Sequence, residues 1–253
     1  MYPIISIFGA EFSTYTLMAV LGLLIAGFIF CRRIAEERPE DNEAVFLLLS
    51  IALGMYLGGH TLFFITNAGE WHLLAEAQSA EELREVFRRL SSGSVFYGGL
   101  IGASLLGLLY LKIRKAPKEV YMDSAALFAP VFHGFARIGC LLSGCCYGME
   151  SSLGFADAAG VTRFPVQLLE AACNLCIAAV IYAVLRKGIL RGKVFYLYLA
   201  MYAFVRFFDE FLRGDEIRGF ILGLSTSQFI SIFVEIFALI MLLLPFIRKR
   251  MKE

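Results

Sequence analysis

The stretch Phe12-Ser-Thr-Tyr-Thr-Leu-Met-Ala-Val-Leu-Gly-Leu-Leu-Ile-Ala-Gly-Phe-Ile-Phe30 has no charged residue and is rich in Leu, Ile, Ala and Phe. A helix rises about 1.5 Å per residue, so a run of this length crosses the roughly 30 Å hydrocarbon core of a bilayer. Its apolar residues do not alternate strictly with polar ones, as they would in a barrel strand. The run therefore predicts a membrane-spanning helix near the start of the chain.

Six further apolar runs follow the first one along the chain. Together the seven lie near Phe12–Phe30, Ala44–Thr66, Val95–Lys112, Tyr121–Leu142, Val166–Leu185, Val194–Leu212 and Thr226–Ile247. The composition agrees with them, because 59% of the 253 residues are hydrophobic and only 18% are charged. A soluble domain has about 45–50% apolar and about 25% charged residues. The sequence predicts an all-α, polytopic membrane protein with seven transmembrane helices in a single transmembrane domain, residues 1–253.

The basic residues predict how these helices are oriented. Most of the 23 Lys and Arg residues follow the first, third, fifth and seventh runs. The positive-inside rule then places the N terminus outside and the C terminus in the cytoplasm. The net charge is only +1 and no segment forms a long basic stripe, so we expect no nucleic-acid partner.

The segment between the second and third runs predicts a short amphipathic helix on the outer surface. Ser79-Ala-Glu-Glu82 has the pattern of a capping box, which marks a helix start. Leu83, Val86, Phe87 and Leu90 then recur at helical spacing, with Arg and Glu residues between them. Such a helix either lies in the membrane interface or packs on its own protein.

One group of polar residues lies at the end of the fourth run, in Phe132-His-Gly-Phe-Ala-Arg-Ile-Gly-Cys-Leu-Leu-Ser-Gly-Cys-Cys-Tyr-Gly148. Charged residues inside membrane spans are costly and therefore mark candidate functional sites. Arg137 stands among closely spaced glycines, which allow ligand and backbone to approach each other. An Arg in this setting can hold a phosphate through two hydrogen bonds, and the alternative is an Arg that snorkels to the interface.

Two other groups of residues complete the candidate site. Arg206 and Glu210 stand four positions apart in the sixth run and so share one helix face, as a site pair or as a purely structural one. Gly98 and Gly102 in the third run have the spacing that lets membrane helices pack closely. Tyr97, just before them, is predicted to face the outer end of the helices.

Six cysteines occur, and Cys140, Cys145 and Cys146 all fall in the segment of Arg137. A thiol beside an arginine has a lowered pKa and can act as a nucleophile in a covalent intermediate. Redox or metal chemistry is a second interpretation, and packing of small, soft side chains in a cavity is a third. The pair Cys173 and Cys176 in the fifth run is expected to pack.

These segments resemble the bacterial prolipoprotein diacylglyceryl transferase family over nearly the whole chain. Ala136–Gly148 aligns with the family's Gly-Arg-x-Gly-Asn-Phe-x-Asn-Gly-Glu-x-x-Gly, and Phe96–Gly102 with its Phe-His-Gly-Gly-Leu-Ile-Gly. Arg163–Glu170 is similar to its Arg-His-Pro-Ser-Gln-Leu-Tyr-Glu, and Arg206 and Glu210 fall on its Arg-x-x-x-Glu. Thr14–Met18 is similar to its Trp-Tyr-Gly-Leu-Met.

The resemblance implies transfer of diacylglyceryl from phosphatidylglycerol to the lipobox cysteine of a prolipoprotein signal peptide. The reaction is expected at the outer face of the bacterial inner membrane, among membrane lipids and with no cofactor or metal. Arg137 and Arg206 would hold the lipid phosphate, Glu210 would orient Arg206, and Tyr15 falls on a site residue of the family. The expected catalytic residues are Tyr97, Arg206, Glu210, Cys145 and Tyr15, and the phosphate-binding residues are Arg137, Arg206, Gly98, Gly99 and His60.

The sequence departs from the family pattern at several of these positions. Tyr97 stands where the family has a histidine proposed as the base, and tyrosine is a poor base at neutral pH. Cys140 and Cys145 replace an Asn and a Glu, and His60 replaces an Arg. Two alternatives therefore remain open. One is a divergent, Cys-rich paralogue that uses Cys145, Cys146 or Cys140 as nucleophile toward another acceptor, and the other is a catalytically silent lipid-binding protein.

Overall fold

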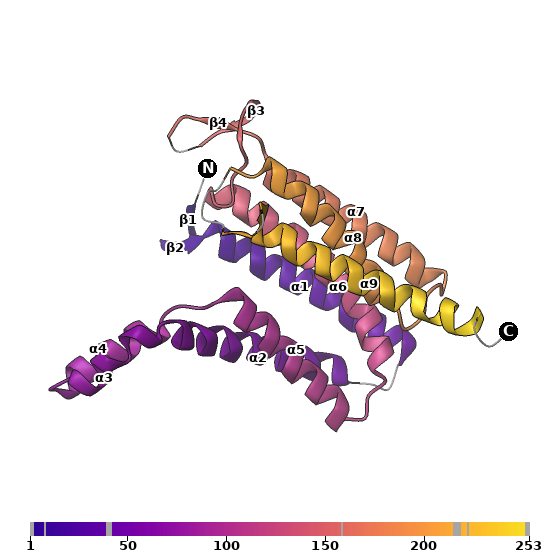
Figure 1. The fold of residues 1–253 in the computed structure, drawn as a ribbon, viewed down its shortest axis with the longest axis horizontal. Helices are drawn as coiled ribbons and strands as arrows, with labels where there is room; N and C mark the ends of the chain where they lie inside the picture. Colours follow the sequence, from indigo (N-terminus) through magenta and orange to yellow (C-terminus); the bar gives the residue numbers. More distant parts are fainter. Residues whose placement is uncertain are drawn as a thin grey trace. The chain divides into compact units, whose positions relative to one another are not determined.

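The computed structural model describes residues 3–7, 9–38, 42–157, 159–214, 219–221 and 223–250. The chain is 75% helical and forms two compact units (Figure 1). Unit 1 consists of Met1–Glu37 and Glu119–Glu253, and unit 2 consists of Arg38–Lys118. The all-α class predicted from the sequence is confirmed.

Each predicted apolar run corresponds to one long helix. The helices are α1 (Thr14–Glu37), α2 (Glu43–Thr66), α3 (His72–Glu76), α4 (Ala80–Ser91), α5 (Phe96–Ile113), α6 (Lys118–Ser143), α7 (Val166–Arg186), α8 (Val194–Asp209) and α9 (Thr226–Arg250), with the 3-10 turns η1 (Ala68–Glu70) and η2 (Glu210–Leu212). Within the described ranges, α1, α2, α6, α7 and α9 are long and apolar enough to cross a membrane, and α5 is a shorter apolar helix. A polytopic membrane protein is thus confirmed, whereas the number of seven spans and their orientation stay predictions.

Unit 1 also contains short antiparallel hairpins that were not predicted from the sequence; one precedes α1 and the others lie between helices. They pair β1 (Ile4–Ile7) with β2 (Ala10–Ser13), β3 (Glu150–Ala156) with β4 (Thr162–Arg163), and β5 (Phe220–Ile221) with β6 (Leu224–Ser225). Because β2 takes up residues to Ser13, α1 begins at Thr14 and not at the predicted Phe12. The hairpin of β3 and β4 lies in the segment that connects α6 to α7.

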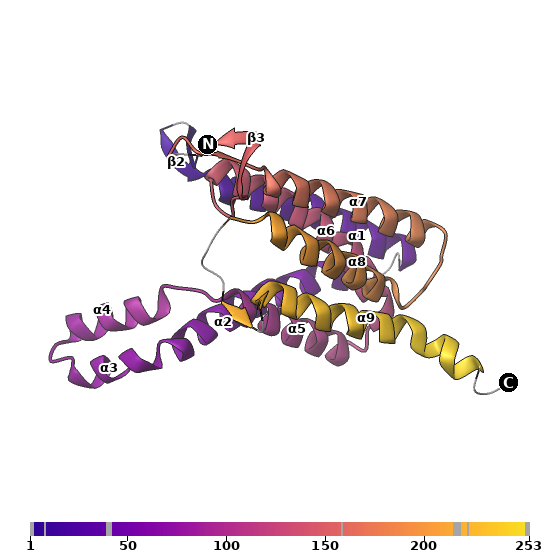
Figure 2. The same ribbon diagram turned by 45° about the horizontal axis from the view of Figure 1, so that its top comes forward.

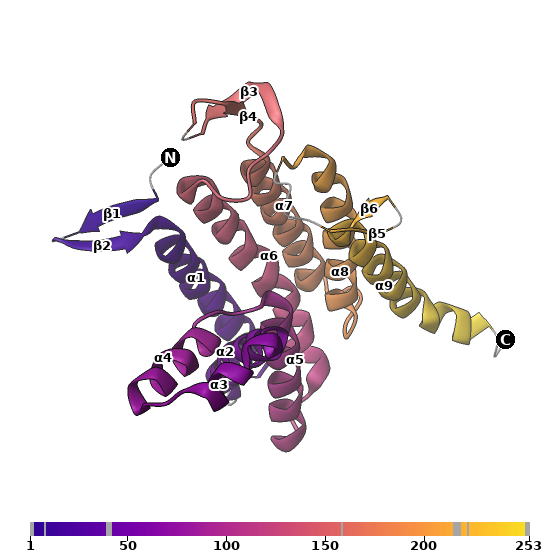
Figure 3. The same ribbon diagram turned by 60° about the vertical axis from the view of Figure 1, so that its left-hand side comes forward.

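Unit 1 is a set of helices that lie side by side in the order α1, α6, α7, α8, α9 (Figure 3). Its buried core is made by small and branched apolar residues, among them Ala26, Leu127, Ile177 and Ile181. Large apolar side chains such as Phe28 are exposed on the outside. This is the arrangement expected where lipid tails, and not water, surround the helices.

The first helix continues well beyond the predicted end at Phe30. Arg33 donates to Glu37 at 2.6 Å, and Arg32 lies 3.5 Å from Glu36. Ion pairs four residues apart stabilise a helix, so α1 extends through its charged end to Glu37. The prediction ended too early because it followed apolar residues alone.

In unit 2 the helices α2 and α5 pack through facing glycines. A Cβ atom at Gly102 would collide with the carbonyl oxygen of Gly54, and one at Gly98 with that of Gly58. The small-residue spacing predicted for the third run therefore does bring two helix backbones together. Arg114 at the end of α5 also bonds Glu43 at the start of α2, with Nε 3.0 Å from the carboxylate.

Replacing Gly102 by Ala is expected to lower the free energy of unfolding by about 1–3 kcal/mol, because the added methyl group forces α2 and α5 apart. Gly69→Ala is the matched control, since its Cβ would meet nothing within 4 Å. Denaturant unfolding in detergent micelles measures both variants. Equal stability of the two would contradict the packing described above.

The amphipathic helix predicted between the second and third runs is α4. Ser79 accepts a hydrogen bond from the backbone N–H of Glu82 at 3.1 Å, and the Glu82 carboxylate accepts one from Gln78 at 2.8 Å. The capping box is therefore formed, with its second bond shifted by one residue. Leu90 is buried, whereas Phe87 is exposed, so the described residues cover only part of the apolar face. Figure 2 shows α3 and α4 lying next to each other.

Candidate active site

Arg137 lies in the last turns of α6, at the end of unit 1 where the β3–β4 hairpin stands (Figure 1). Its side chain is only 12% exposed. Two residues further on, Gly139 allows α1 to approach, since a Cβ there would lie 3.3 Å from the Cα of Tyr15 and 3.1 Å from the Cβ of Met18. The absence of a side chain at Gly139 therefore places Tyr15 beside the segment of Arg137.

Glu170 in α7 is the common partner of three arginines. Its Oε2 is ion-paired with Nε of Arg137, and its Oε1 lies 3.3 Å from Nη1 of Arg213 and 4.0 Å from Nη1 of Arg206. All these side chains are buried or nearly so, and that of Glu170 is 3% exposed. One carboxylate thus joins α6, α7, α8 and the segment after η2.

Arg206 also contacts two polar side chains besides Glu170. Its Nη2 lies 2.7 Å from Oε2 of Glu210 and donates to Oγ of Ser227 at 3.0 Å. The predicted pairing of Arg206 with Glu210 is confirmed, although Glu210 stands in η2 and not in α8. Within the described part of the chain, the buried Nη1 of Arg206 has no hydrogen-bond acceptor.

The charges of the cluster nearly balance. Asp209, at the end of α8, is buried and interacts electrostatically with Glu170 and the arginines. Arg137, Arg206 and Arg213 are therefore matched by Glu170, Glu210 and Asp209. A buried charge without a partner is strongly unfavourable, so this balance lets the cluster persist among apolar helices. A bound phosphate would take over some of the guanidinium hydrogen bonds from the carboxylates.

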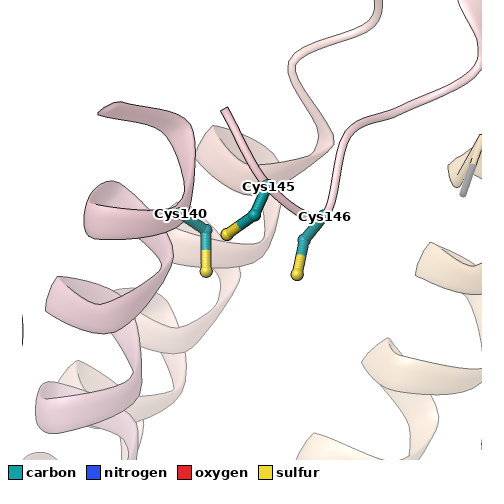
Figure 4. Close-up of side chains that lie close together, drawn as sticks. All are labelled: Cys140, Cys145 and Cys146. Atoms are coloured by element: carbon teal, nitrogen blue, oxygen red, sulfur yellow. The ribbon is translucent and has the colours of Figure 1, made fainter. Parts of the chain in front are cut away.

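Cys140, Cys145 and Cys146 lie close together because of the backbone conformation at the C-terminal end of α6. Gly144 has a φ of +81°, its N–H bonds the Leu141 carbonyl at 3.3 Å, and the Cys145 N–H bonds the Cys140 carbonyl at 3.1 Å. This is a Schellman motif, which brings the side chains at its two ends into contact. Here those side chains are Cys140 and Cys145. Together with Cys146 their sulfur atoms lie within 4.8 Å of one another (Figure 4).

Cys146 lies beside the guanidinium of Arg213. Hydrogen bonds from the Cys140 and Cys145 thiols, together with the Arg213 guanidinium, hold the pKa of Cys146 below its ordinary value. Cys145 is the exposed member of the group, and its Sγ lies 3.3 Å from the Ser143 hydroxyl. Arg213 is thus the arginine beside Cys146. Arg137 interacts electrostatically with Cys140, so the predicted proximity of a thiol to Arg137 is found as well.

The loop that carries these thiols is tied to the rest of the site by hydrogen bonds. Gln167 of α7 donates through Nε2 to the Cys145 carbonyl at 2.9 Å. The N–H of Met149 bonds the Leu212 carbonyl at 2.9 Å, and that of Gly214 bonds the Tyr147 carbonyl at 3.1 Å. These bonds hold the segment of Arg213 alongside the loop and so place Arg213 next to Cys146.

The remaining predicted site residues, Tyr97, Gly98, Gly99 and His60, belong to unit 2. His60 Nδ1 lies 2.9 Å from the Ser91 carbonyl, so His60 connects α2 to the end of α4. Gly98 serves the packing of α5 on α2. Tyr97 is 46% exposed at the start of α5. The role of these residues in binding or catalysis stays a prediction.

The model of the prolipoprotein diacylglyceryl transferase family matches residues 3–244. The chain belongs to this family. Relatives named phosphatidylglycerol–prolipoprotein diacylglyceryl transferase include one of Clostridium tetani, 30% identical over 99% of this chain and 100% of its own length. One of Clostridium perfringens, whose name carries the number 2, is 36% identical over 90% of this chain and 89% of its own. One of Geobacter sulfurreducens is 30% identical over 87% and 83%.

Some residues of this site were not predicted as site residues from the sequence. Glu170 appeared in the sequence analysis only as the last residue of the family-like segment Arg163–Glu170, and Arg213 was not among the predicted site residues. Asp209 was not considered. Their signal was present, because a buried arginine in a membrane helix requires carboxylate partners, and Glu170 is the acidic residue of its run.

Proposed function

We propose that this chain transfers the diacylglyceryl group of phosphatidylglycerol to the thiol of the lipobox cysteine in a prolipoprotein. Membership of the family, with relatives of that name that align along most of their length, carries the proposal. The buried arginine cluster supports it, since this reaction needs cations for a departing phosphate. We further propose seven spans in the bacterial inner membrane, with the site at the outer face.

In this reaction the acceptor thiolate attacks the glycerol carbon that bears the phosphate. A carbon–sulfur bond forms as the carbon–oxygen bond breaks, and the electron pair leaves with glycerol phosphate. Arg137 and Arg206, whose Nη1 has no hydrogen-bond acceptor among the described residues, would stabilise the charge that develops on the phosphate. Glu210 and Ser227 would hold Arg206 in position for this task.

The other predicted site residues would serve the substrates. Tyr15, on the first turn of α1 beside Gly139, would contact the lipid headgroup. For Tyr97, Gly98, Gly99 and His60 the proposal keeps the substrate role that the resemblance to the family implies. The bound lipid and signal peptide would cover the site and exclude water, which would otherwise compete with the thiol.

The proposal predicts that purified protein releases glycerol phosphate from phosphatidylglycerol vesicles only when a lipobox peptide with its cysteine is added. Headgroup-labelled lipid and chromatography of the released product measure this directly. The same peptide with serine in place of its cysteine is the control and should give no release. Absence of release, with the Clostridium tetani relative active alongside, would contradict the proposed function.

A further inference from the structure

The most unusual feature of the site is the group of three thiols at the end of α6. Cys140, Cys145 and Cys146 offer three sulfur atoms within 4.8 Å of one another, and all three cysteines are free (Figure 4). In a zinc–thiolate site the Zn–S distance is about 2.3 Å, which places the sulfur atoms roughly 3.8 Å apart. Side-chain rotations that bring the sulfur atoms closer by about 1 Å would therefore form a three-thiolate site.

The backbone holds these thiols together without any metal. The Schellman motif at Gly144 sets Cys140 against Cys145, and Cys146 has a φ of +55°, in the left-handed region that non-glycine residues rarely adopt. Such a conformation is maintained only where the surrounding contacts fix it. The hydrogen bond from Gln167 to the Cys145 carbonyl is one of these contacts. The site is thus largely formed before a ligand arrives.

The neighbours of the thiols are hydrogen-bond donors suited to thiolates. The Arg213 guanidinium interacts with Cys146, and the Ser143 hydroxyl lies 3.3 Å from the sulfur of Cys145. Groups of this kind around a metal site orient its ligands and stabilise their charge. Three thiolates and one divalent cation carry a net charge of −1, which Arg213 would balance.

We propose that Cys140, Cys145 and Cys146 bind a thiophilic divalent cation of the zinc type. A disulfide would use only two of the three thiols, whereas a cation uses all three. Cys145 is exposed, which gives the ion a path of entry. Binding needs no oxidant or reductant, because three thiols lose three protons to water as three metal–sulfur bonds form.

The catalytic use of this ion rests on the proposed function. Zinc sites with three protein ligands keep a fourth position for water or substrate. The acceptor thiol would bind there and lose its proton to water, since a thiol that coordinates zinc is deprotonated. Its sulfur would then form the bond to the glycerol carbon, and glycerol phosphate would leave toward Arg137 and Arg206. The ion would thereby act as the activator of the acceptor.

Titration of the reduced, metal-free protein with Co²⁺ tests the binding. We expect one equivalent to bind with the intense near-ultraviolet absorption of cobalt–thiolate bonds, and Zn²⁺ to displace it. Cys140→Ser, Cys145→Ser and Cys146→Ser should each weaken binding on the order of 100-fold or more. The Cys173→Ser/Cys176→Ser double variant is the matched control, because this pair lies within α7, and it should bind as the unchanged protein does.

A second measurement needs no variant and so does not depend on how the variants fold. Added Zn²⁺ should protect Cys140, Cys145 and Cys146 from alkylation, as read by mass spectrometry, and leave the alkylation of Cys31 unchanged. Absence of a cobalt–thiolate spectrum in the unchanged protein, or equal protection of all six cysteines, would overturn the proposed site.

The transfer assay separates this inference from the proposed function. Transfer that disappears with a chelator and returns with Zn²⁺ supports the catalytic use. A cobalt site together with transfer that a chelator does not affect would refute that use and leave the binding site in place. A cobalt site without transfer in any metal would refute the proposed function, and transfer without a cobalt site would refute this inference alone.

Discussion

Replacing Arg137 by Ala is expected to reduce diacylglyceryl transfer by about 10²–10³-fold, the usual cost of removing one donor that stabilises developing negative charge. Arg137 is buried at the end of α6 and is held by Glu170. Its fixed position means that no reorganisation is needed when the phosphate departs. Initial rates of lipopeptide formation from phosphatidylglycerol vesicles measure the effect.

Two further variants test whether the effect depends on the hydrogen-bond geometry and the position of Arg137. Arg137→Lys keeps the charge but not the forked pair of donors, so we expect an intermediate rate. Arg186→Ala, at the exposed end of α7, removes a charge of the same kind away from the cluster and should transfer at the unchanged rate. Equal rates for Arg137→Ala and Arg186→Ala would contradict the phosphate role of Arg137.

Replacing Glu170 by Gln is expected to have the largest effect on stability. The carboxylate is the shared partner of Arg137, Arg206 and Arg213, and its loss leaves buried positive charge uncompensated. Breaking a buried ion pair by removing one partner costs about 3–5 kcal/mol. Denaturant unfolding in detergent micelles should show a fall of this size in the free energy of unfolding.

A control and a double variant make this prediction specific. Glu36 pairs with Arg32 at 3.5 Å on an exposed helix end, so Glu36→Gln should change stability by less than about 1 kcal/mol. Adding Arg213→Ala to Glu170→Gln should restore part of the lost stability, because it removes one of the uncompensated charges. If Glu170→Gln and Glu36→Gln have equal effects, Glu170 is not the partner that holds the arginines.

The membrane helices could be predicted from the sequence because apolar length is a local property. The run Val166–Leu185 became α7, Val166–Arg186, with hardly a change at either end. The end of α1 was missed because Arg33 and Glu37 extend the helix through an ion pair, which a search for apolar residues does not detect. The hairpins were missed because strands of two to seven residues leave little pattern.

The site was predicted in part for a related reason. Arg206 and Glu210 are neighbours on one helix, so their spacing predicted the pair that the structure shows. Arg137 and Glu170 lie far apart in the sequence, and only the packing of α6 on α7 brings them together. The contact of Cys140 with Cys145 was within reach of sequence reasoning, since a Gly at position 144 is the usual end of a helix in a Schellman motif.

The mass of the acceptor peptide after incubation with phosphatidylglycerol vesicles tests the central claim most directly. We expect a lipobox peptide to gain the mass of one diacylglyceryl group through a thioether, which survives hydroxylamine treatment. We also expect one glycerol phosphate to be released per modified peptide. An unmodified peptide, or an added group that hydroxylamine removes as it removes a thioester, would contradict it when a relative modifies the same peptide in parallel.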